Sequence, residues 1–255
     1  MNFSHAIVRL PGSNFNKGIT TSGLGTPDYT KIMQQHNDYI RALESLAVQV
    51  QVLDPLPGYP DAYFVEDVAI LLPELAVITI PGAQARRGEI DAIIPVLTEF
   101  LPLEYIHPPG LLDGGDVIIT DRQAFIGLSK RTNLAGAEQL GKILKKNNLP
   151  WTPITLNSGL HLKSSVNYIA EDILLISEAL SEHAAFDEFE KIVVVDSESY
   201  ACNSLWINHN LIIPVGFPSV RAKLNALNMP IIELEVSEIR KMDGGLTCLS
   251  LRFNQ

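Results

Sequence analysis

The sequence predicts an α/β fold, a five-bladed propeller with pseudo-fivefold symmetry in which each blade has the order strand, strand, helix, strand (ββαβ). Strand hairpins recur along the chain, and the first strands begin at residues 68, 117, 166, 204 and 249, which are 49, 49, 38 and 45 residues apart. A spacing of about 45 residues favours a radial or solenoid repeat. Helical patterns lie between the hairpins. No linker rich in Pro, Gly or Ser divides the chain, so we expect one domain over residues 1–255.

Each of the first four hairpins joins two short runs rich in β-branched residues through a polar turn, which is typical of strands. The paired runs are 68–72 with 75–80, 117–120 with 124–127, 166–169 with 173–176, and 204–207 with 211–214. A fifth first strand, 249–253, has no partner after it, and we expect it to pair with the run 6–9. That pairing would close a ring and remove the exposed sheet edges. The alternative is an ordinary α/β sandwich in which hairpins recur by chance.

Three helices are predicted between the strands from their caps and apolar faces. Thr26 and Pro27 are typical of the N-cap and first residue of a helix whose inner face runs from Tyr29 to Leu43. Asn133 and Ser219 are the expected N-caps of two later helices.

Composition narrows the classes of function. Apolar residues make up 46% of the chain and charged residues 19%, which excludes a disordered protein. A net charge of −10 argues against nucleic acid and anionic membranes as partners, because both need a basic face, but it suits a small cationic substrate. The N-terminus lacks a basic region followed by an apolar stretch, and two cysteines cannot build a disulfide framework. We therefore expect a cytoplasmic protein.

Polar residues stand at equivalent points of successive repeats, where the first strands of a ring would converge near its axis. Buried charges are costly unless they are paired or used, so a neutral core would not place them there. We therefore expect a reaction centre on the axis. The positions are Glu66, Asp67, Asp113, Asp116, His161, Cys202, Asn203 and Cys248.

Each of these residues also has a purely structural interpretation. A cysteine is usually a small buried hydrophobe, His161 lies between two leucines, and the glycine pair 114–115 is typical of a turn. Cys248 differs from Cys202 because it follows the glycine pair 244–245, which permits a tight backbone approach beside the thiol. We favour Cys248 as the reactive thiol and Cys202 as a structural residue.

Six motifs in order along the chain carry a family resemblance: FVED at 64–67, PGA with RR at 81–87, LDGGDV at 112–117, GLSKRTN at 127–133, LHLKS at 160–164 and DGGLTC at 243–248. With these six motifs the sequence resembles the dimethylarginine dimethylaminohydrolases, and the resemblance covers essentially the whole chain. That family belongs to the guanidine-modifying (pentein) superfamily. The resemblance implies a five-bladed α/β propeller, in agreement with the repeat.

The resemblance also implies the roles of individual residues. The family's nucleophile, histidine and orienting acid fall on Cys248, His161 and Asp113. Its substrate-binding positions fall on Ile19, Asp61, Phe64, Glu66, Asp67, Arg86 and Arg131. The stretch 15–19 is expected to be a lid over the pocket.

These roles imply a hydrolysis of Nω-methylated arginine. Glu66 and Asp67 would hold the planar guanidinium by charge-assisted hydrogen bonds, and Arg86 and Arg131 would hold the substrate α-carboxylate. The thiolate would add to the guanidinium carbon, giving a covalent thiouronium and then citrulline with dimethylamine or methylamine. No step needs a metal or an organic cofactor.

Lys163 bears on the choice between superfamily members. Deiminases typically carry a second acid two residues beyond the catalytic histidine, and this chain has Lys163 there. The loss of that acid favours an alkylated guanidinium over free arginine. An arginine deiminase-like hydrolase of another guanidino or ureido compound and a non-catalytic propeller serving as a binding protein are the alternatives. We expect a monomer or a homodimer.

Overall fold

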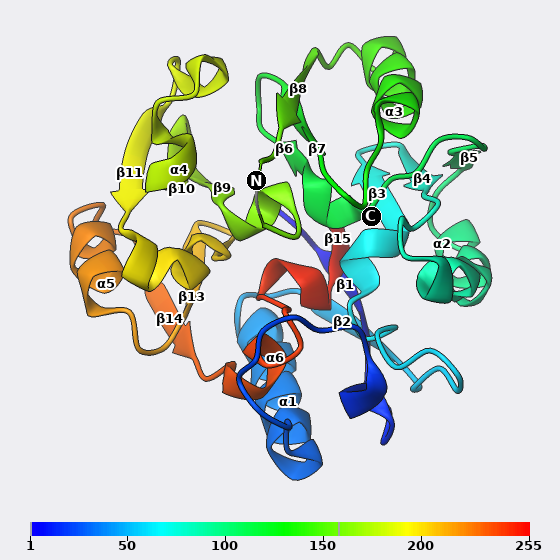
Figure 1. Cartoon of the computed structure of the whole chain (residues 1–255), viewed down its shortest axis with the longest axis horizontal. Helices are drawn as coiled ribbons and strands as arrows, with labels where there is room; N and C mark the ends of the chain where they lie inside the picture. Colours follow the sequence, from blue (N-terminus) through cyan, green and yellow to red (C-terminus); the bar gives the residue numbers. More distant parts are fainter. Residues whose placement is uncertain (1, 158) are drawn as a thin grey trace.

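Five small three-stranded sheets are arranged around a common axis in the computed structural model, which describes residues 2–157 and 159–255 (Figure 1). In each sheet the inner strand is antiparallel to the middle strand, and the outer strand is parallel to it. The blades, from inner to outer strand, are β15 (Leu251–Phe253), β1 (His5–Arg9) and β2 (Gln49–Leu53); β3 (Ala69–Leu72), β4 (Leu75–Ile78) and β5 (Leu103–Tyr105); β6 (Val117–Ile119), β7 (Ala124–Leu128) and β8 (Trp151–Thr155); β9 (Val166–Ala170), β10 (Ile173–Ser177) and β11 (Glu190–Val194); β12 (Leu205–Ile207), β13 (Asn210–Pro214) and β14 (Ile231–Leu234).

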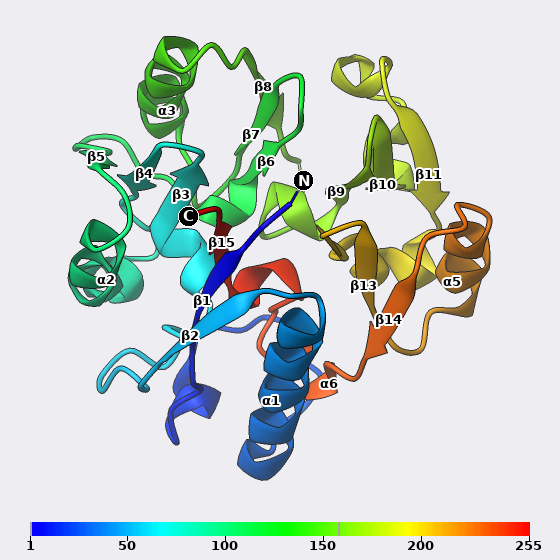
Figure 2. The same cartoon turned by 180° about the vertical axis from the view of Figure 1, so that it is seen from behind.

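Helical segments connect the middle strand of each blade to its outer strand, because parallel neighbours need a crossover connection. Figure 2 shows them on the periphery of the ring. They are α1 (Tyr29–Ser45), the pair η3 (Gln84–Ala92) and α2 (Ile94–Thr98), α3 (Leu134–Lys146), the pair α4 (Glu178–Ser181) and η6 (Ala184–Phe186), and α5 (Pro218–Asn225). The predicted ββαβ propeller is confirmed, and the sandwich alternative is wrong.

The ring is closed by the pairing of the first and last strands of the chain. β1 is antiparallel to β15, with Ala6 opposite Arg252, and the Ser4 backbone N–H donates to the Phe253 carbonyl at 3.2 Å. The two chain ends therefore lie in one blade, as the sequence predicted for residues 6–9 and 249–253.

Short 3₁₀ turns precede the inner strands, so three of those strands begin later than the sequence predicted. The turns are η2 (Val65–Val68), η4 (Gly114–Asp116), η5 (Leu162–Ser164), η7 (Asp196–Cys202) and η8 (Thr247–Leu249). β3, β12 and β15 begin at Ala69, Leu205 and Leu251. Val68 and Leu249 belong to the turns η2 and η8, and Ser204 lies between η7 and β12.

Two predicted helix caps are wrong and one is confirmed. The N-cap of α1 is Asp28 rather than Thr26, because the Asp28 carboxylate accepts a hydrogen bond from the Lys31 backbone N–H. The backbone N–H of Asp28 in turn donates to Glu238 Oε2 at 2.7 Å. Ser219 lies inside α5, which starts with a proline. Asn133 caps α3 as predicted and accepts from the Gly136 N–H.

Four apolar clusters fill the spaces between blades and between sheets and helices. In the described part of the chain, no helix is long and apolar enough to cross a bilayer.

His36, on the inner face of α1, is fully buried, and neither ring nitrogen has a hydrogen-bond partner among the described residues. Burial lowers its pKa to about 4, and the nearby backbone of Arg9 offsets part of that effect. An unfolded histidine titrates near pH 6.5. The unfolded chain therefore binds a proton that the folded chain excludes between these two pH values, and stability falls as the pH drops from about 6.5 to 4.

We predict that His36→Leu reduces the acid sensitivity of the fold. Two to three pKa units correspond to a contribution on the order of 3 kcal/mol. Urea unfolding at pH 7.5 and 4.5 measures the effect: the wild-type chain should lose more free energy of unfolding than His36→Leu. The exposed-site variant His107→Leu should behave like the wild type. Equal losses in all three proteins would contradict the assignment.

Candidate active site

The 3₁₀ turns before the inner strands meet at the axis and contact one another in succession. Each brings one sequence-predicted polar residue to the centre: Asp67 lies on η2, Asp113 and His161 precede η4 and η5, Asn203 follows η7, and Cys248 lies on η8. The site is therefore shared by all five blades, which is why residues far apart in sequence are neighbours.

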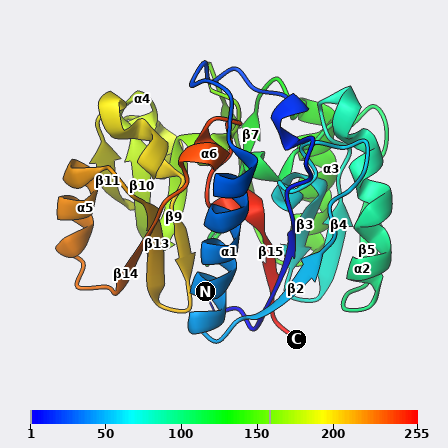
Figure 3. The same cartoon turned by 90° about the horizontal axis from the view of Figure 1, so that it is seen from below.

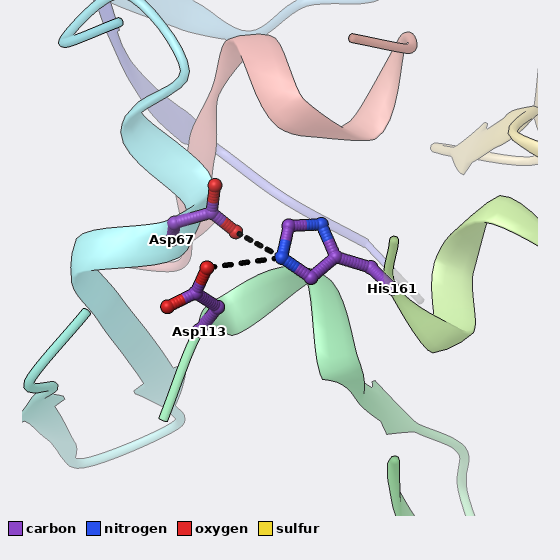
Figure 4. Close-up of side chains that lie close together, drawn as sticks. All are labelled: Asp67, Asp113 and His161. Carbon is purple, nitrogen blue, oxygen red and sulfur yellow. Dashed lines mark hydrogen bonds and ion pairs between the residues drawn. The ribbon is translucent and has the colours of Figure 1, made fainter. Parts of the chain in front are cut away.

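Two buried carboxylates face the same ring nitrogen of His161 (Figure 4). Its Nε2 is 3.0 Å from Asp113 Oδ2 and 3.9 Å from Asp67 Oδ1. Burial disfavours the charged ring, but Asp67, Asp113 and Asp116 outweigh it and raise the pKa of His161 to about 9. At neutral pH the ring is an imidazolium, so it can donate a proton.

These three side chains also have the spacing of a metal site, with their ligand atoms within 4.8 Å of one another. An imidazolium has no lone pair at Nε2 for a metal ion. The arrangement suits an ion-paired proton donor better than a metal centre.

Asp67 is held by the protein on both carboxylate oxygens. Oδ2 accepts from Arg86 Nη1 at 2.5 Å, and Oδ1 accepts from the Gly115 N–H at 3.0 Å. Burial alone would raise its pKa, but His161 and Arg86 outweigh burial and lower the pKa to about 2. Asp67 is therefore a fixed negative charge at the centre of the site.

Arg86 is buried, and most of its donors are used within the protein. Its Nε and Nη2 donate to the Glu89 carboxylate, and Nη2 also donates to the Phe64 carbonyl at 2.9 Å. The Glu89 partner was missed from the sequence, although its i, i+3 spacing from Arg86 was a signal. Arg86 holds Asp67; a contact between Arg86 and a substrate carboxylate stays a prediction.

The thiols of Cys248 and Cys202 differ in their exposure to solvent rather than in their pKa. Burial raises the pKa of each thiol to about 12, and Glu66 and Asp67 add to the effect at Cys248. Cys202 is fully buried, whereas Cys248 is partly exposed. The resting Cys248 is thus an accessible thiol in its neutral form.

A cavity of about 30 Å³ brings together most of the residues that the sequence singled out. Asp113 stands behind His161, and its Oδ1 accepts from the Gly82 N–H at 2.8 Å. Arg131 reaches the same carboxylate, with Nη1 at 3.8 Å from Oδ2. The predicted residues in the cavity wall are Ile19, Asp61, Phe64, Asp67, Arg86, Arg131, His161 and Cys248.

Glu66 is not among the residues that line this cavity, and its expected contact with the guanidinium stays a prediction. Its Oε1 accepts from Lys163 Nζ at 2.7 Å and from Arg252 Nη2 at 3.2 Å, and its Oε2 accepts from Thr247 Oγ1 at 2.7 Å. Consecutive residues of a 3₁₀ turn point in different directions, so Glu66 turns away from the cavity that Asp67 faces. Glu66 is an internal counter-charge.

Thr247, the residue before Cys248, is bound on every polar atom. Its N–H donates to Asn203 Oδ1 at 2.9 Å, and Asn203 Nδ2 lies 3.2 Å from its hydroxyl. That hydroxyl donates to Glu66, and the Thr247 carbonyl accepts from Arg252 Nη1 at 3.0 Å. The close approach of Asn203 requires a glycine at position 245, because a Cβ there would lie 2.4 Å from Asn203 Cγ. The backbone that carries the Cys248 thiol is therefore fixed.

The segment between β1 and α1 crosses the face of the ring opposite the two chain ends (Figure 3). The Ile19 N–H donates to both oxygens of Asp61, each at 3.1 Å, and Thr21 donates to Asp243. This segment covers the cavity with Ile19, as expected of a lid. Its mobility stays a prediction.

Comparison with known proteins finds matches that cover almost the whole chain, three of which are described here. A dimethylarginine dimethylaminohydrolase from Pseudomonas aeruginosa is 40% identical over 253 residues, which are 98% of this chain and 100% of that protein. The crystal structure of its cysteine-to-serine variant, complexed with citrulline, has a TM-score of 0.97 and covers 99% of this chain and 100% of that chain at 40% identity. The N-terminal domain of a cyanobacterial arginine dihydrolase has a TM-score of 0.88 at 18% identity, covers 99% of this chain and 97% of that one, and shares the fold.

The propeller, its axial thiol and the paired imidazolium define a hydrolase of the guanidine-modifying superfamily. The profile of the family "N,N dimethylarginine dimethylhydrolase, eukaryotic" matches residues 27–251. The chain therefore belongs to the dimethylarginine dimethylaminohydrolase family.

The difference in access predicts which thiol reacts. Limited treatment with iodoacetamide should label Cys248 and spare Cys202, with the site located by mass spectrometry. Because burial raises the pKa of Cys248, its labelling rate should still be rising above pH 9 in the substrate-free protein. Preferential labelling of Cys202, or a plateau below pH 8, would contradict this result.

The bonds around Thr247 predict a loss of turnover in an almost isosteric variant. Thr247→Val leaves Glu66 Oε2 without its donor and takes one acceptor from Asn203 Nδ2. The displaced Cys248 backbone should lower kcat roughly 10–100-fold with little change in KM. Thr247→Ser keeps the hydroxyl and should retain most of kcat. Steady-state kinetics of the two variants make the test; wild-type kcat in Thr247→Val would disprove it.

Proposed function

We propose that this protein hydrolyses Nω-methylated arginine to citrulline and dimethylamine or methylamine, through a covalent thiouronium on Cys248. The observation that carries the proposal is the placement of an accessible thiol, an imidazolium and a fixed carboxylate on one cavity wall. The Pseudomonas aeruginosa relative has the corresponding name, and a structure of its variant contains citrulline.

The cavity suits a substrate with a cationic end and an anionic end. Asp67 accepts N–H groups from the guanidinium by charge-assisted hydrogen bonds and orients its plane. Arg131 holds the α-carboxylate at the other end. The three guanidinium nitrogens of Arg86 are bound to Asp67, Glu89 and Phe64, so its main role is to hold Asp67. Ile19 and Asp61 close the cavity over the bound molecule.

Substrate binding also prepares the nucleophile. In the empty site the thiol of Cys248 is neutral, because burial and the charges of Glu66 and Asp67 oppose a thiolate. A guanidinium adds a positive charge beside the sulfur, which favours the thiolate where it is needed. The thiol proton is released to solvent as the thiolate forms, and the thiolate then bonds to the guanidinium carbon while the π electrons of the C=N bond move to nitrogen.

His161 performs the two proton transfers that follow. Its imidazolium protonates the departing nitrogen, the C–N bond breaks, and the alkylamine leaves. The neutral ring then takes a proton from a water molecule that attacks the thiouronium, releasing citrulline and regenerating Cys248. Asp113 orients the ring and stabilises its charged form.

We also infer a cytoplasmic location, which the two free thiols support. A monomer or homodimer remains our proposal for the assembly state, and the reaction requires neither metal nor cofactor.

A substrate panel tests the proposed reaction. Unmethylated arginine presents additional N–H donors where the chain has Lys163 instead of an acid, and an unsatisfied donor costs about 1–3 kcal/mol. We therefore expect kcat/KM for asymmetric dimethylarginine to exceed that for arginine by at least about 10-fold. Ureido product and released amine are measured for both and for monomethylarginine. Equal or faster turnover of arginine would move the assignment to a deiminase.

The role of His161 predicts separable chemical steps. His161→Ala should lose at least roughly 10²–10⁴-fold in kcat. His161→Gly should still form the covalent adduct, detected by mass spectrometry of the intact protein, but hydrolyse it slowly, while Cys248→Ser should form none. Near-wild-type turnover in His161→Ala would exclude this mechanism.

A further inference from the structure

Asp116 is a fully buried acid that the proposed reaction does not use. It ends the turn η4 and lies behind the cavity wall, because His161 and Arg131 line the cavity and Asp116 is not among the described residues that do. A buried carboxylate is costly unless its oxygens are bound. The groups that bind the two oxygens therefore indicate the role of this acid.

One oxygen of Asp116 holds the backbone that carries the histidine. Oδ1 accepts from the Leu162 N–H at 2.9 Å, across 46 positions of sequence. Leu162 directly follows His161 and is the first residue of the turn η5, and the first N–H groups of such a turn have no partner within it. The contact requires a glycine at position 127, where a Cβ would lie 2.8 Å from Oδ1. Asp116 therefore fixes the backbone next to His161.

The other oxygen of Asp116 reaches the loop that carries Arg131. Oδ2 accepts from Ser129 Oγ at 2.6 Å. Ser129 Oγ in turn accepts from the Arg131 N–H at 2.9 Å and from the Thr132 N–H at 3.1 Å, which uses its full hydrogen-bonding capacity. The Ser129 N–H closes the loop by donating to the Thr132 carbonyl at 3.0 Å. One carboxylate thus joins the backbone of the histidine to the backbone of the arginine.

We propose that Asp116 is a positioning residue that holds His161 and Arg131 at a fixed separation, so that the proton donor and the anchor for the α-carboxylate match one substrate length. The inference rests on the proposed function, which assigns those two roles, and deepens it. In the substrate, a chain of fixed length joins the guanidinium to the α-carboxylate. Both ends are engaged together only when the two side chains have the corresponding spacing.

Asp116 also acts on the histidine through its charge. Asp67, Asp113 and Asp116 all raise the pKa of His161, and the thiol of Cys248 lines the same cavity. Burial raises the pKa of Asp116 itself, while the charge of the histidine and two hydroxyls of the loop oppose that effect. The acid therefore has two separable effects: it orders the arginine loop through hydrogen bonds, and it supports the histidine through both a hydrogen bond and a charge.

Ser129→Ala tests the arginine branch without changing a charge. It removes the acceptor of the Arg131 N–H and should raise KM for asymmetric dimethylarginine roughly 10-fold, with kcat within about two-fold of the wild-type value. The decarboxylated analogue of this substrate has no group for Arg131, so its kcat/KM should stay unchanged. Ser129→Thr keeps the hydroxyl and should retain most of the affinity. No loss in Ser129→Ala, or an equal loss for both substrates, would overturn the proposal.

Asp116→Asn tests both branches, because the amide keeps the shape of the side chain but loses its charge and one acceptor. We expect kcat to fall roughly 10–100-fold and KM for asymmetric dimethylarginine to rise. The pKa of His161, measured by NMR of the labelled ring, should fall by roughly one pH unit.

Two controls isolate the effect on the histidine. Ser129→Ala keeps the charge of Asp116, and Glu238→Gln neutralises another buried acid, on α6 (Ser237–Arg240). Both should leave the pKa of His161 at its wild-type value. An unchanged pKa in Asp116→Asn, or an equal decrease in Glu238→Gln, would contradict the role of Asp116.

Protection of Cys248 against iodoacetamide separates this inference from the reaction itself. In the wild-type protein, arginine should protect the thiol at several-fold lower concentration than agmatine, its decarboxylated form, and Ser129→Ala should abolish most of that preference. If methylated arginine is not hydrolysed but this pattern holds, the proposed function fails and the positioning role stands. A wild-type preference in Ser129→Ala refutes the positioning role even if methylated arginine is hydrolysed.

Discussion

The buried ion pair between Arg86 and Asp67 is the interaction on which the rest of the site depends. It joins Nη1 to Oδ2 at 2.5 Å, and Glu89 holds the other edge of the guanidinium. Because Asp67 stays ionised, it keeps His161 charged across the centre of the ring, together with Asp113. A protonated Asp67 would leave the imidazolium in a desolvated site with less compensation and the substrate cation without its acceptor.

A second set of charges, beneath the thiol, is kept separate from the first. Glu66 is adjacent to Asp67 in sequence, yet it pairs with Lys163 and Arg252 and receives the Thr247 hydroxyl. One system supports proton transfer, and the other supports the backbone of the nucleophile. The 3₁₀ turn that separates two successive acids therefore lets one short motif serve both purposes.

The sequence was sufficient to predict the fold and the residues that converge on the axis, because equivalent positions of repeated hairpins can be aligned with one another. The sequence was insufficient to predict which side chains form hydrogen bonds and ion pairs with those residues. Lys163 was considered in the sequence only as a missing acid, and its ion pair with Glu66, 97 positions away, is one that no local pattern encodes. The cap of α1 failed for the same reason: Thr26 and Asp28 are both suitable N-caps, and the bond from Asp28 to Glu238 decides between them.

The closure of the ring has a consequence for biosynthesis. Cys248 lies on the turn immediately before β15, and β15 completes the blade that β1 begins. A nascent chain emerges from the ribosome in the opposite order, with the carboxylates and the histidine first and the nucleophile last. The strand that closes the propeller is thus also the one that brings Cys248 to the site, so a partly synthesised chain has the carboxylates and the histidine without the nucleophile. Closure of the ring and completion of the active site therefore occur together.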